Sequence, residues 1–101
     1  MYTASVTSKE AIRTIRLCVQ ADRVIVKEHC VQRLAERGFF WGDVLVLMES
    51  PAQIRGDGDD EFGRNRWFVA GKIAGRHSAE LLCVIDRAGP TTVFITVYWE
   101  D

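Results

Sequence analysis

Histidine, proline and lysine are scarce in this sequence of 101 residues, with two, two and three copies respectively. No apolar run approaches the roughly 20 residues that a membrane-spanning helix needs, so no membrane partner is expected. The first twenty residues mix Lys9, Glu10, Arg13 and Arg16 with apolar residues and lack the continuous apolar stretch of a signal peptide. We therefore expect one cytoplasmic domain with a single core.

Cysteine is also rare, and its spacing excludes several kinds of site. Cys18, Cys30 and Cys83 are odd in number and far apart, and no two of them form a Cys-x-x-Cys pair. A disulfide framework or a zinc knuckle is therefore not expected, and we predict three reduced, buried thiols without zinc. Phosphate-binding glycine loops and the common hydrolase motifs are absent as well, so no metal and no cofactor are predicted.

An excess of positive charge is missing too. The formal net charge is −1. The chain is therefore not expected to bind nucleic acid through a surface that is basic all over. Arginine nevertheless supplies ten of the thirteen basic residues. Its planar guanidinium meets phosphate or carboxylate through two parallel hydrogen bonds, so local anion-binding patches stay open.

The N-terminal half predicts three helices and one short strand. Apolar residues three and four apart predict helices over 8–20, 29–37 and 41–49. Consecutive β-branched residues predict a strand over 23–27. We expect Ser8 to cap the first helix, Gly38 to end the second and Ser50-Pro51 to stop the third.

The C-terminal half predicts strands over 52–55, 66–73, 81–86 and 91–99, with an acidic loop over 56–63 and turns over 75–78 and 88–90. In the last strand, alternation predicts one face with Val93, Ile95, Val97 and Trp99, and the opposite face with Phe94, Thr96 and Tyr98. The fold class is thus α+β, with N-terminal helices packed on one face of a curved antiparallel sheet. We place Leu34, Leu47 and Ile95 in the core. Residues 1–22 form a helical extension and 23–101 the body of one domain.

The first candidate site lies on the second predicted helix. His29, Arg33 and Arg37 recur every four residues, so they share one helical face and could bind a phosphate backbone. His29 could also transfer a proton near neutral pH. The alternative interpretation is a solvated face with local ion pairs to Glu28 and Glu36.

The second candidate site lies on and around the first long hairpin, where basic residues gather: Arg64, Arg66, Lys72, Arg76 and His77. In an alternating strand, Arg66, Phe68, Ala70 and Lys72 share one face. Bases could stack on the ring while the cations bind phosphates. An exposed hairpin face without a ligand is the alternative.

Two further groups have weaker patterns. Carboxylates cluster at Asp57, Asp59, Asp60 and Glu61, but their spacing does not match a calcium-binding loop, and we interpret them as a solvated loop. Tyr98, near the end of the last strand, could act as an acid or position a phosphate. An aromatic side chain that faces the interior is the alternative there.

Several short motifs in their order resemble the domain-of-unknown-function family numbered 4258, which belongs to the RelE/ParE-like toxin superfamily. The matching residues are Lys27-Glu28-His29-Cys30, Arg33-Leu34, Glu36-Arg37-Gly38-Phe39, Asp43-Val44, Ser50-Pro51 and the strand Val93-Phe94-Ile95-Thr96-Val97. The resemblance covers about three-quarters of the chain, from Arg23 to Tyr98. The chain departs from the family around Phe40-Trp41-Gly42, where a serine or threonine cap is usual, and in its added helix over 8–20.

The resemblance implies a RelE-like fold and is consistent with descent from toxins that cleave messenger RNA. Metal-free cleavage needs a base, a cation for the phosphorane charge and an acid. The candidates for the base and acid are His29 and His77, with Tyr98 as an auxiliary donor. The candidates for the phosphate clamp are Arg33, Arg37, Arg64, Arg66 and Lys72. The partners would be RNA, and an antitoxin-like protein or a second copy of the chain.

The alternative function is a non-catalytic module for protein interaction or self-association. Phe39, Phe40 and Trp41 form a bulky apolar elbow between two predicted helices. Together with an edge strand, this elbow could dock a partner or another copy of the chain.

Overall fold

A computed structural model of the protein describes residues 7–73 and 77–100. These residues form three helices and five strands: α1 (Ser8–Gln20), β1 (Val24–Val26), α2 (Glu28–Ala35), α3 (Trp41–Glu49), β2 (Gln53–Asp59), β3 (Asn65–Ile73), β4 (His77–Asp86) and β5 (Thr91–Trp99). The coarse class is α+β, as predicted. Among the described residues, no helix has the length and apolar character needed to cross a membrane.

The strands form one sheet in the order β1-β5-β4-β3-β2. The predicted antiparallel meander of β3, β4 and β5 is confirmed. β1 differs from the prediction, because it pairs with β5 in parallel and makes the sheet mixed. Parallel pairing needs a long connection between the two strands, and here the chain from α2 to β4 provides it.

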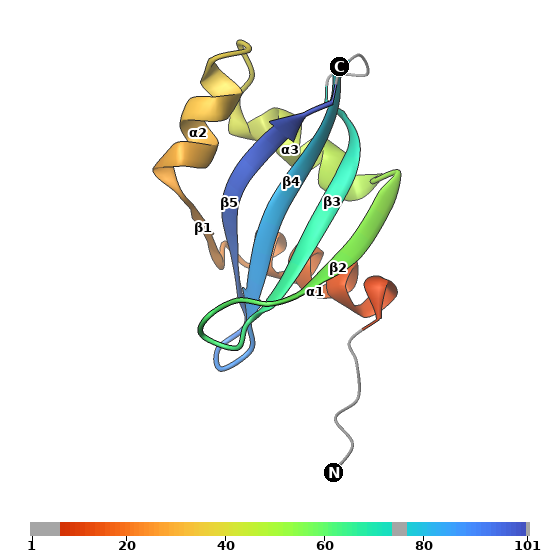
Figure 1. The fold of residues 1–101 in the computed structure, drawn as a ribbon, viewed down its shortest axis with the longest axis vertical. Helices are drawn as coiled ribbons and strands as arrows, with labels where there is room; N and C mark the ends of the chain where they lie inside the picture. Colours follow the sequence, from red (N-terminus) through yellow and green to blue (C-terminus); the bar gives the residue numbers. More distant parts are fainter. Residues whose placement is uncertain (1–6, 74–76, 101) are drawn as a thin grey trace.

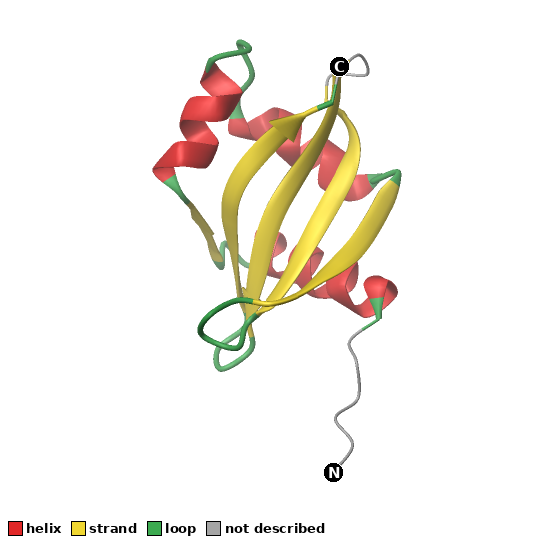
Figure 2. Ribbon diagram, viewed as in Figure 1, coloured by secondary structure: helices red, strands yellow, loops and turns green. Residues whose placement is uncertain are grey.

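The helices are placed unequally around this sheet (Figures 1 and 2). α1 and α3 cover one face, while α2 lies beside β5 at the edge of the sheet. Side chains from all three helices meet the covered face in one core, as predicted for Leu34 and Leu47. Its members are Ala11, Ile15, Cys30, Leu34, Phe39, Val44, Leu47, Met48, Trp67, Val69, Ile73, Ala79, Leu81, Cys83, Ile85, Phe94 and Val97.

Within residues 7–73 and 77–100, no helix lies on the other face of the sheet, and we call this face the open face. In β3 the side chains alternate, so that Trp67, Val69 and Ile73 are buried on the helix side. The predicted shared face of Arg66, Phe68, Ala70 and Lys72 is the less buried one. This alternation places a mixed basic and aromatic stripe on the open face.

The alternation predicted for β5 is wrong beyond Phe94. Cys83 pairs with Phe94 but Leu82 pairs with Thr96, so Ile95 is an extra residue in the ladder. Such a bulge reverses the facing of every later side chain. Ile95 consequently lines a cleft on the open face rather than the core, and Val97 enters the core in its place.

Several element ends also differ from the predictions. Thr7, not Ser8, caps α1, because its hydroxyl accepts the Glu10 N–H. β2 continues to Asp59 and so includes part of the predicted loop. Its pairing with β3 shifts register between Gly56 and Asp59, and Gly58 within this stretch has φ 69°. β4 begins at His77, inside the predicted turn over 75–78, whose first two residues lie outside the described residues.

The second helix ends at Ala35, two residues before the predicted end at Arg37, and Gly38 lies in the turn that follows it. This residue has φ 77°, a conformation that glycine adopts without strain. The Phe39 N–H then donates to the Leu34 carbonyl at 3.0 Å, which closes the helix end. The chain turns sharply here and enters α3 three residues later.

Replacing Thr92 with valine should stabilise the protein. Thr92 is fully buried, and its hydroxyl has no hydrogen-bond partner in the described part of the chain. An unsatisfied buried polar group costs about 1–3 kcal/mol, so Thr92→Val should raise the free energy of unfolding by about 1 kcal/mol in a urea titration. Thr96→Val, on the open face of the same strand, is the matched control and should gain less. Equal or opposite effects would show that the Thr92 hydroxyl is satisfied in solution.

Candidate functional site

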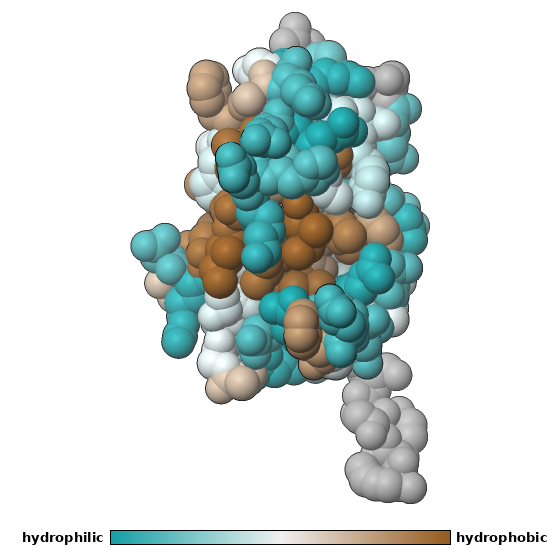
Figure 3. Space-filling model, turned by 60° about the vertical axis from the view of Figure 1, so that its left-hand side comes forward, coloured by the Kyte–Doolittle hydropathy of each residue, from teal (hydrophilic) through white to brown (hydrophobic). Residues whose placement is uncertain are grey.

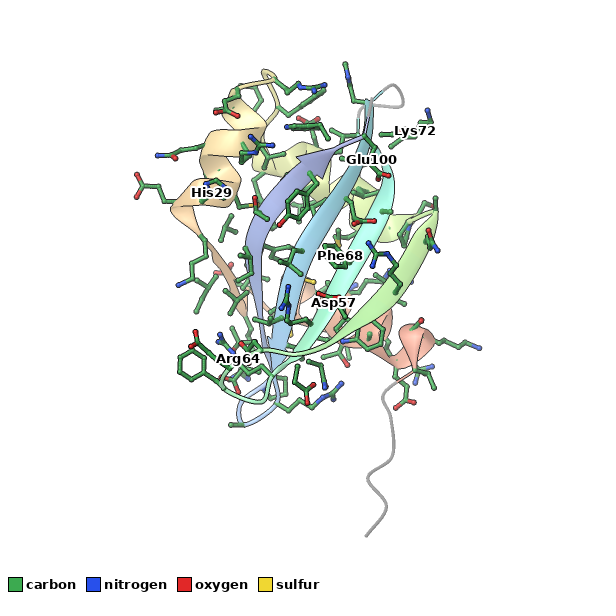
Figure 4. The ribbon with its side chains drawn as sticks, in the orientation of Figure 1. His29, Asp57, Arg64, Phe68, Lys72 and Glu100 are labelled. Atoms are coloured by element: carbon green, nitrogen blue, oxygen red, sulfur yellow. The ribbon has the colours of Figure 1, made fainter. Side chains whose placement is uncertain are left out.

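The open face gathers three of the eight predicted site residues, together with the predicted ring of Phe68. β3 contributes Arg66, Phe68 and Lys72, and β5 contributes Tyr98. Figure 4 shows Phe68 near the middle of the sheet, Lys72 near its upper end and Asp57 below Phe68 on the side of β2. The helices leave this surface uncovered (Figure 2), so a ligand can approach it.

Two aromatic rings form the centre of the open face. The ring centroids of Phe68 and Tyr98 lie 6.2 Å apart, with the β4 residue Glu80 between their strands. Tyr98 is 46% exposed, which is high for a large side chain on a sheet. The rings offer flat apolar area beside a phenol hydroxyl, a combination that suits stacking of a planar ligand.

An arginine covers one of these rings. The guanidinium carbon of Arg55 lies 4.2 Å from the Phe68 ring centroid. Its Nη2 donates to Glu80 Oε1 at 2.8 Å, and the Glu80 side chain is only 16% exposed. Arg55 is thereby held over the ring by a carboxylate and a cation–π contact. Neither Arg55 nor Glu80 was predicted as a site residue, and Glu80 lies just before the predicted strand over 81–86, although β4 includes it.

The two basic residues predicted on β3 differ in their partners. Arg66 Nη2 lies 3.0 Å from Asp57 Oδ2, across the β2–β3 pair. Lys72 is exposed and has no ion pair with any described residue. Arg66 is thus pre-positioned by a half-exposed carboxylate, whereas Lys72 offers an uncommitted charge.

The hairpin between β2 and β3 is organised by the Asp60 side chain. Its carboxylate accepts hydrogen bonds from the N–H groups of Phe62 and Arg64, and from Arg64 Nε at 2.7 Å. Partial burial alone would raise the pKa of Asp60, but the bonds from Arg64 and Phe62 together hold this pKa below its ordinary value. The predicted phosphate ligand Arg64 is therefore part of the turn itself.

This hairpin bends over the lower part of the open face and forms a shallow cleft of about 440 Å³. Apolar side chains form its floor, and charged side chains form its rim. The lining residues are Asp59, Asp60, Glu61, Arg64, Arg66, Leu82, Val84 and Ile95. Leu82 and Val84 are buried although they face away from the helices, because the hairpin covers them.

The other predicted site residues lie away from the open face. His29 is exposed on α2, at the side of the sheet (Figure 4). His77 pairs with Ile73 on the helix side, and its ring meets Phe39 edge-on with centroids 5.1 Å apart. The structure therefore does not bring the two histidines and Tyr98 onto one surface.

Of the two arginines predicted on the second helix, Arg37 lies two residues beyond the end of α2 and is exposed, as predicted, whereas Arg33 is not fully exposed. Arg33 is half-buried, and its Nε donates to the Val97 carbonyl at 3.3 Å, beyond the part of β5 that pairs with β1. It also lies 3.5 Å from Glu36. The guanidinium of Arg37 lies over the Trp99 ring at 4.8 Å. Both residues help to hold α2 against the edge of β5.

The predicted acidic loop is more structured than expected. Asp57 pairs with Arg66, Asp59 accepts from Asn65 Nδ2 at 2.9 Å, and Asp60 holds the hairpin. No group of three metal-ligating side chains suited to an ion occurs among the described residues. These carboxylates therefore act as partners of the neighbouring cations and amides.

The cysteines are free and buried, as predicted. Burial raises the pKa of the Cys30 thiol to about 11. Burial, and then the charge of Cys30, raise the pKa of Cys83 to about 12. Both thiols stay protonated near neutral pH, so they are poor nucleophiles.

Comparison of the chain with protein-family models, with curated proteins and with solved structures gave no match. The family resemblance found in the sequence therefore stays a prediction.

The Asp60 turn should make the protein acid-sensitive. Because the native pKa of Asp60 lies below the ordinary value of 3.8, its stabilisation is present above that value and is lost as pH falls through the native pKa. Between about pH 4 and about pH 2, the melting temperature should therefore fall more steeply in wild type than in Asp60→Asn. Glu61→Gln, at an exposed carboxylate of the same loop, should follow wild type. Parallel curves for wild type and Asp60→Asn would contradict this role.

Proposed function

We propose that this protein binds single-stranded RNA on the open face of its sheet. The observation that carries the proposal is the aromatic pair Phe68 and Tyr98 on an uncovered sheet, with Arg55, Arg66 and Lys72 around it. Single-stranded nucleic acid is bound by this combination, in which bases stack on rings and cations follow the phosphates. The family resemblance favours RNA over DNA as the ligand.

The charges of the open face set the expected strength of binding. Arg55 and Arg66 are paired with Glu80 and Asp57. Lys72 lies at the same end of the sheet as the exposed Glu100 (Figure 4), so the charges of the described residues on this face nearly cancel. Each phosphate contact with a single strand contributes about 0.7 to the salt slope of the binding constant. With one to three phosphate contacts, the binding constant should depend only weakly on the salt concentration, and stacking should supply much of the affinity.

The proposed activity is binding rather than cleavage. Cleavage would need a general base and a general acid within hydrogen-bond reach of one phosphate. Of the three candidates for these roles, only Tyr98 lies on the open face, while His29 and His77 lie elsewhere. An antitoxin-like partner stays a prediction of the resemblance.

Removing either ring should weaken RNA binding. Loss of base–aromatic stacking typically costs about 1–3 kcal/mol per base, so Tyr98→Ala and Phe68→Ala should each raise the dissociation constant by about 5- to 150-fold. Fluorescence anisotropy with labelled single-stranded RNA measures this change. Tyr98→Phe keeps the ring and should bind like wild type, and Val46→Ala, at an exposed position of α3, should change nothing.

The outcomes of this experiment separate the possibilities. An absence of salt-sensitive RNA binding by wild type would overturn the proposal. Equal affinity for single-stranded DNA would show that the open face binds single strands of either nucleic acid. Product formation that requires Tyr98 would show that the binding surface is also catalytic.

Removing the carboxylate beside Arg66 should strengthen RNA binding. In the free protein Asp57 occupies the Arg66 guanidinium at 3.0 Å, and a phosphate has to compete with it. Asp57→Asn removes that competitor and should lower the dissociation constant by about 2- to 10-fold at low salt, with a steeper salt slope. Glu61→Gln removes the same charge from the nearby rim of the cleft without freeing an arginine. An equal gain in both variants would mean that net charge alone determines affinity.

A further inference from the structure

The cleft under the β2–β3 hairpin continues the open face from its central aromatic pair. Leu82, on the floor of the cleft, is the direct partner of Phe68 across the β3–β4 ladder, and Val84 is the partner of Arg66. Directly paired residues on one face of a sheet have Cβ atoms about 5 Å apart. A base that enters the cleft would therefore lie next to a base stacked on Phe68.

The cleft differs in its lining from the groove between α2 and α3. That groove lies on the side of the molecule where Figure 3 shows an extensive apolar area, and uncharged residues line it throughout. The cleft instead has an apolar floor of Leu82, Val84 and Ile95 and a charged rim. An apolar surface bordered by a few polar groups is the usual form of a site for a small planar ligand.

The carboxylates of the rim differ in how far they are already occupied. Asp60 holds the hairpin turn, and Asp59 accepts a hydrogen bond from Asn65 Nδ2 at 2.9 Å. Glu61 is exposed, and no hydrogen bond or ion pair joins it to another described residue. An ionised carboxylate only accepts hydrogen bonds, so Glu61 offers two oxygens to a ligand with two neighbouring N–H donors.

The rim also supplies donors, through Arg64. Its Nε donates to Asp60 Oδ2 at 2.7 Å, while its Nη groups make no hydrogen bond to a described residue. The guanidinium carbon lies 5.2 Å from the Phe62 ring centroid, so both a carboxylate and a ring hold this side chain in place. The cleft thus presents acceptors and donors together.

We propose that the cleft recognises guanine in the RNA strand bound on the open face, an inference that rests on the proposed function. Guanine carries N1–H and N2–H₂ donors side by side, which match the two oxygens of Glu61. Its O6 and N7 acceptors match the free donors of an arginine. Adenine and cytosine place a ring-nitrogen acceptor beside the amino group, and uracil flanks its single N–H with two carbonyls. A carboxylate would face an acceptor in each of these three bases.

The charges of the cleft also favour a base over a phosphate. Its lining carries three carboxylates and two guanidiniums, and both guanidiniums already face a carboxylate. A phosphate within the cleft would therefore meet net negative charge. A neutral base with N–H donors is not repelled in this way, and its flat face can cover the apolar floor.

Fluorescence anisotropy with labelled RNA strands of about eight nucleotides tests this proposal through base preference. An all-uridine strand is compared with strands that carry one guanosine, adenosine or inosine at the same central position. Wild type should bind the guanosine strand about 5- to 150-fold more tightly than the all-uridine strand, as for one bidentate contact. The adenosine strand controls for stronger stacking of a purine. Inosine lacks the N2 amino group and should lose most of the preference.

The variant Glu61→Gln assigns the preference to the cleft. The amide replaces one acceptor oxygen with a donor, so this variant should no longer prefer the guanosine strand to the adenosine strand. Its affinity for the all-uridine strand should not fall, because that strand makes no contact with the carboxylate. Glu28→Gln, the same substitution at an exposed glutamate of α2, is the matched control and should keep the wild-type preference.

The outcomes separate this inference from the proposed function. Equal affinity of wild type for the guanosine, adenosine and all-uridine strands would overturn guanine recognition and leave RNA binding intact. A guanine preference that survives Glu61→Gln would overturn it as well, because the base would then be recognised elsewhere. No binding of any strand would overturn both this inference and the proposed function.

Discussion

A single extra residue in β5 determines which side chains the open face presents. Before Ile95, Val93 faces outward and Phe94 inward. Without the bulge, strict alternation would turn Tyr98 toward the helices and Val97 toward solvent. With the bulge, Val97 packs in the core and Tyr98 lies beside Phe68. The aromatic pair on which the proposed function rests therefore exists because the ladder slips by one residue.

The central strand β4 is buried on both of its faces over much of its length. Its inward residues Leu81, Cys83 and Ile85 meet the helices, while its outward residues Leu82 and Val84 are buried as well. The hairpin held by Asp60 bends over the lower end of the open face and shields them. The middle of the face, with Phe68 and Tyr98, and its upper end, with Lys72, stay accessible. A sheet that is apolar on both faces thus exposes its aromatic pair only where the hairpin does not reach.

Local signals in the sequence predicted the elements well and their long-range contacts poorly. The bounds of α1, α3 and β5 match the predicted ranges 8–20, 41–49 and 91–99, because apolar spacing, the capping preference and proline act within a few residues. The bulge at Ile95 has no such signal, since no glycine or proline marks it, and Ile95 was wrongly placed in the core. The contacts of His77 and Arg33 could not be predicted from local sequence signals either. Their surroundings depend on Phe39 and on the open edge of β5, both distant in the sequence.

The arginines explain how a chain with a net charge of −1 can still present a surface for phosphates. Arg55 and Arg66 each have a carboxylate partner, and Arg55 is further fixed on the Phe68 ring. The pair of Arg66 and Asp57 is partly exposed on both sides, and such an ion pair contributes at most about 1 kcal/mol, so a phosphate can displace Asp57 without a large penalty. The pairing nonetheless keeps each long side chain in one geometry, which reduces the conformational entropy lost on binding. Acidic residues on this face thus lower affinity and hold the cations in place for a ligand at the same time, so a surface for phosphates is compatible with the net charge of −1.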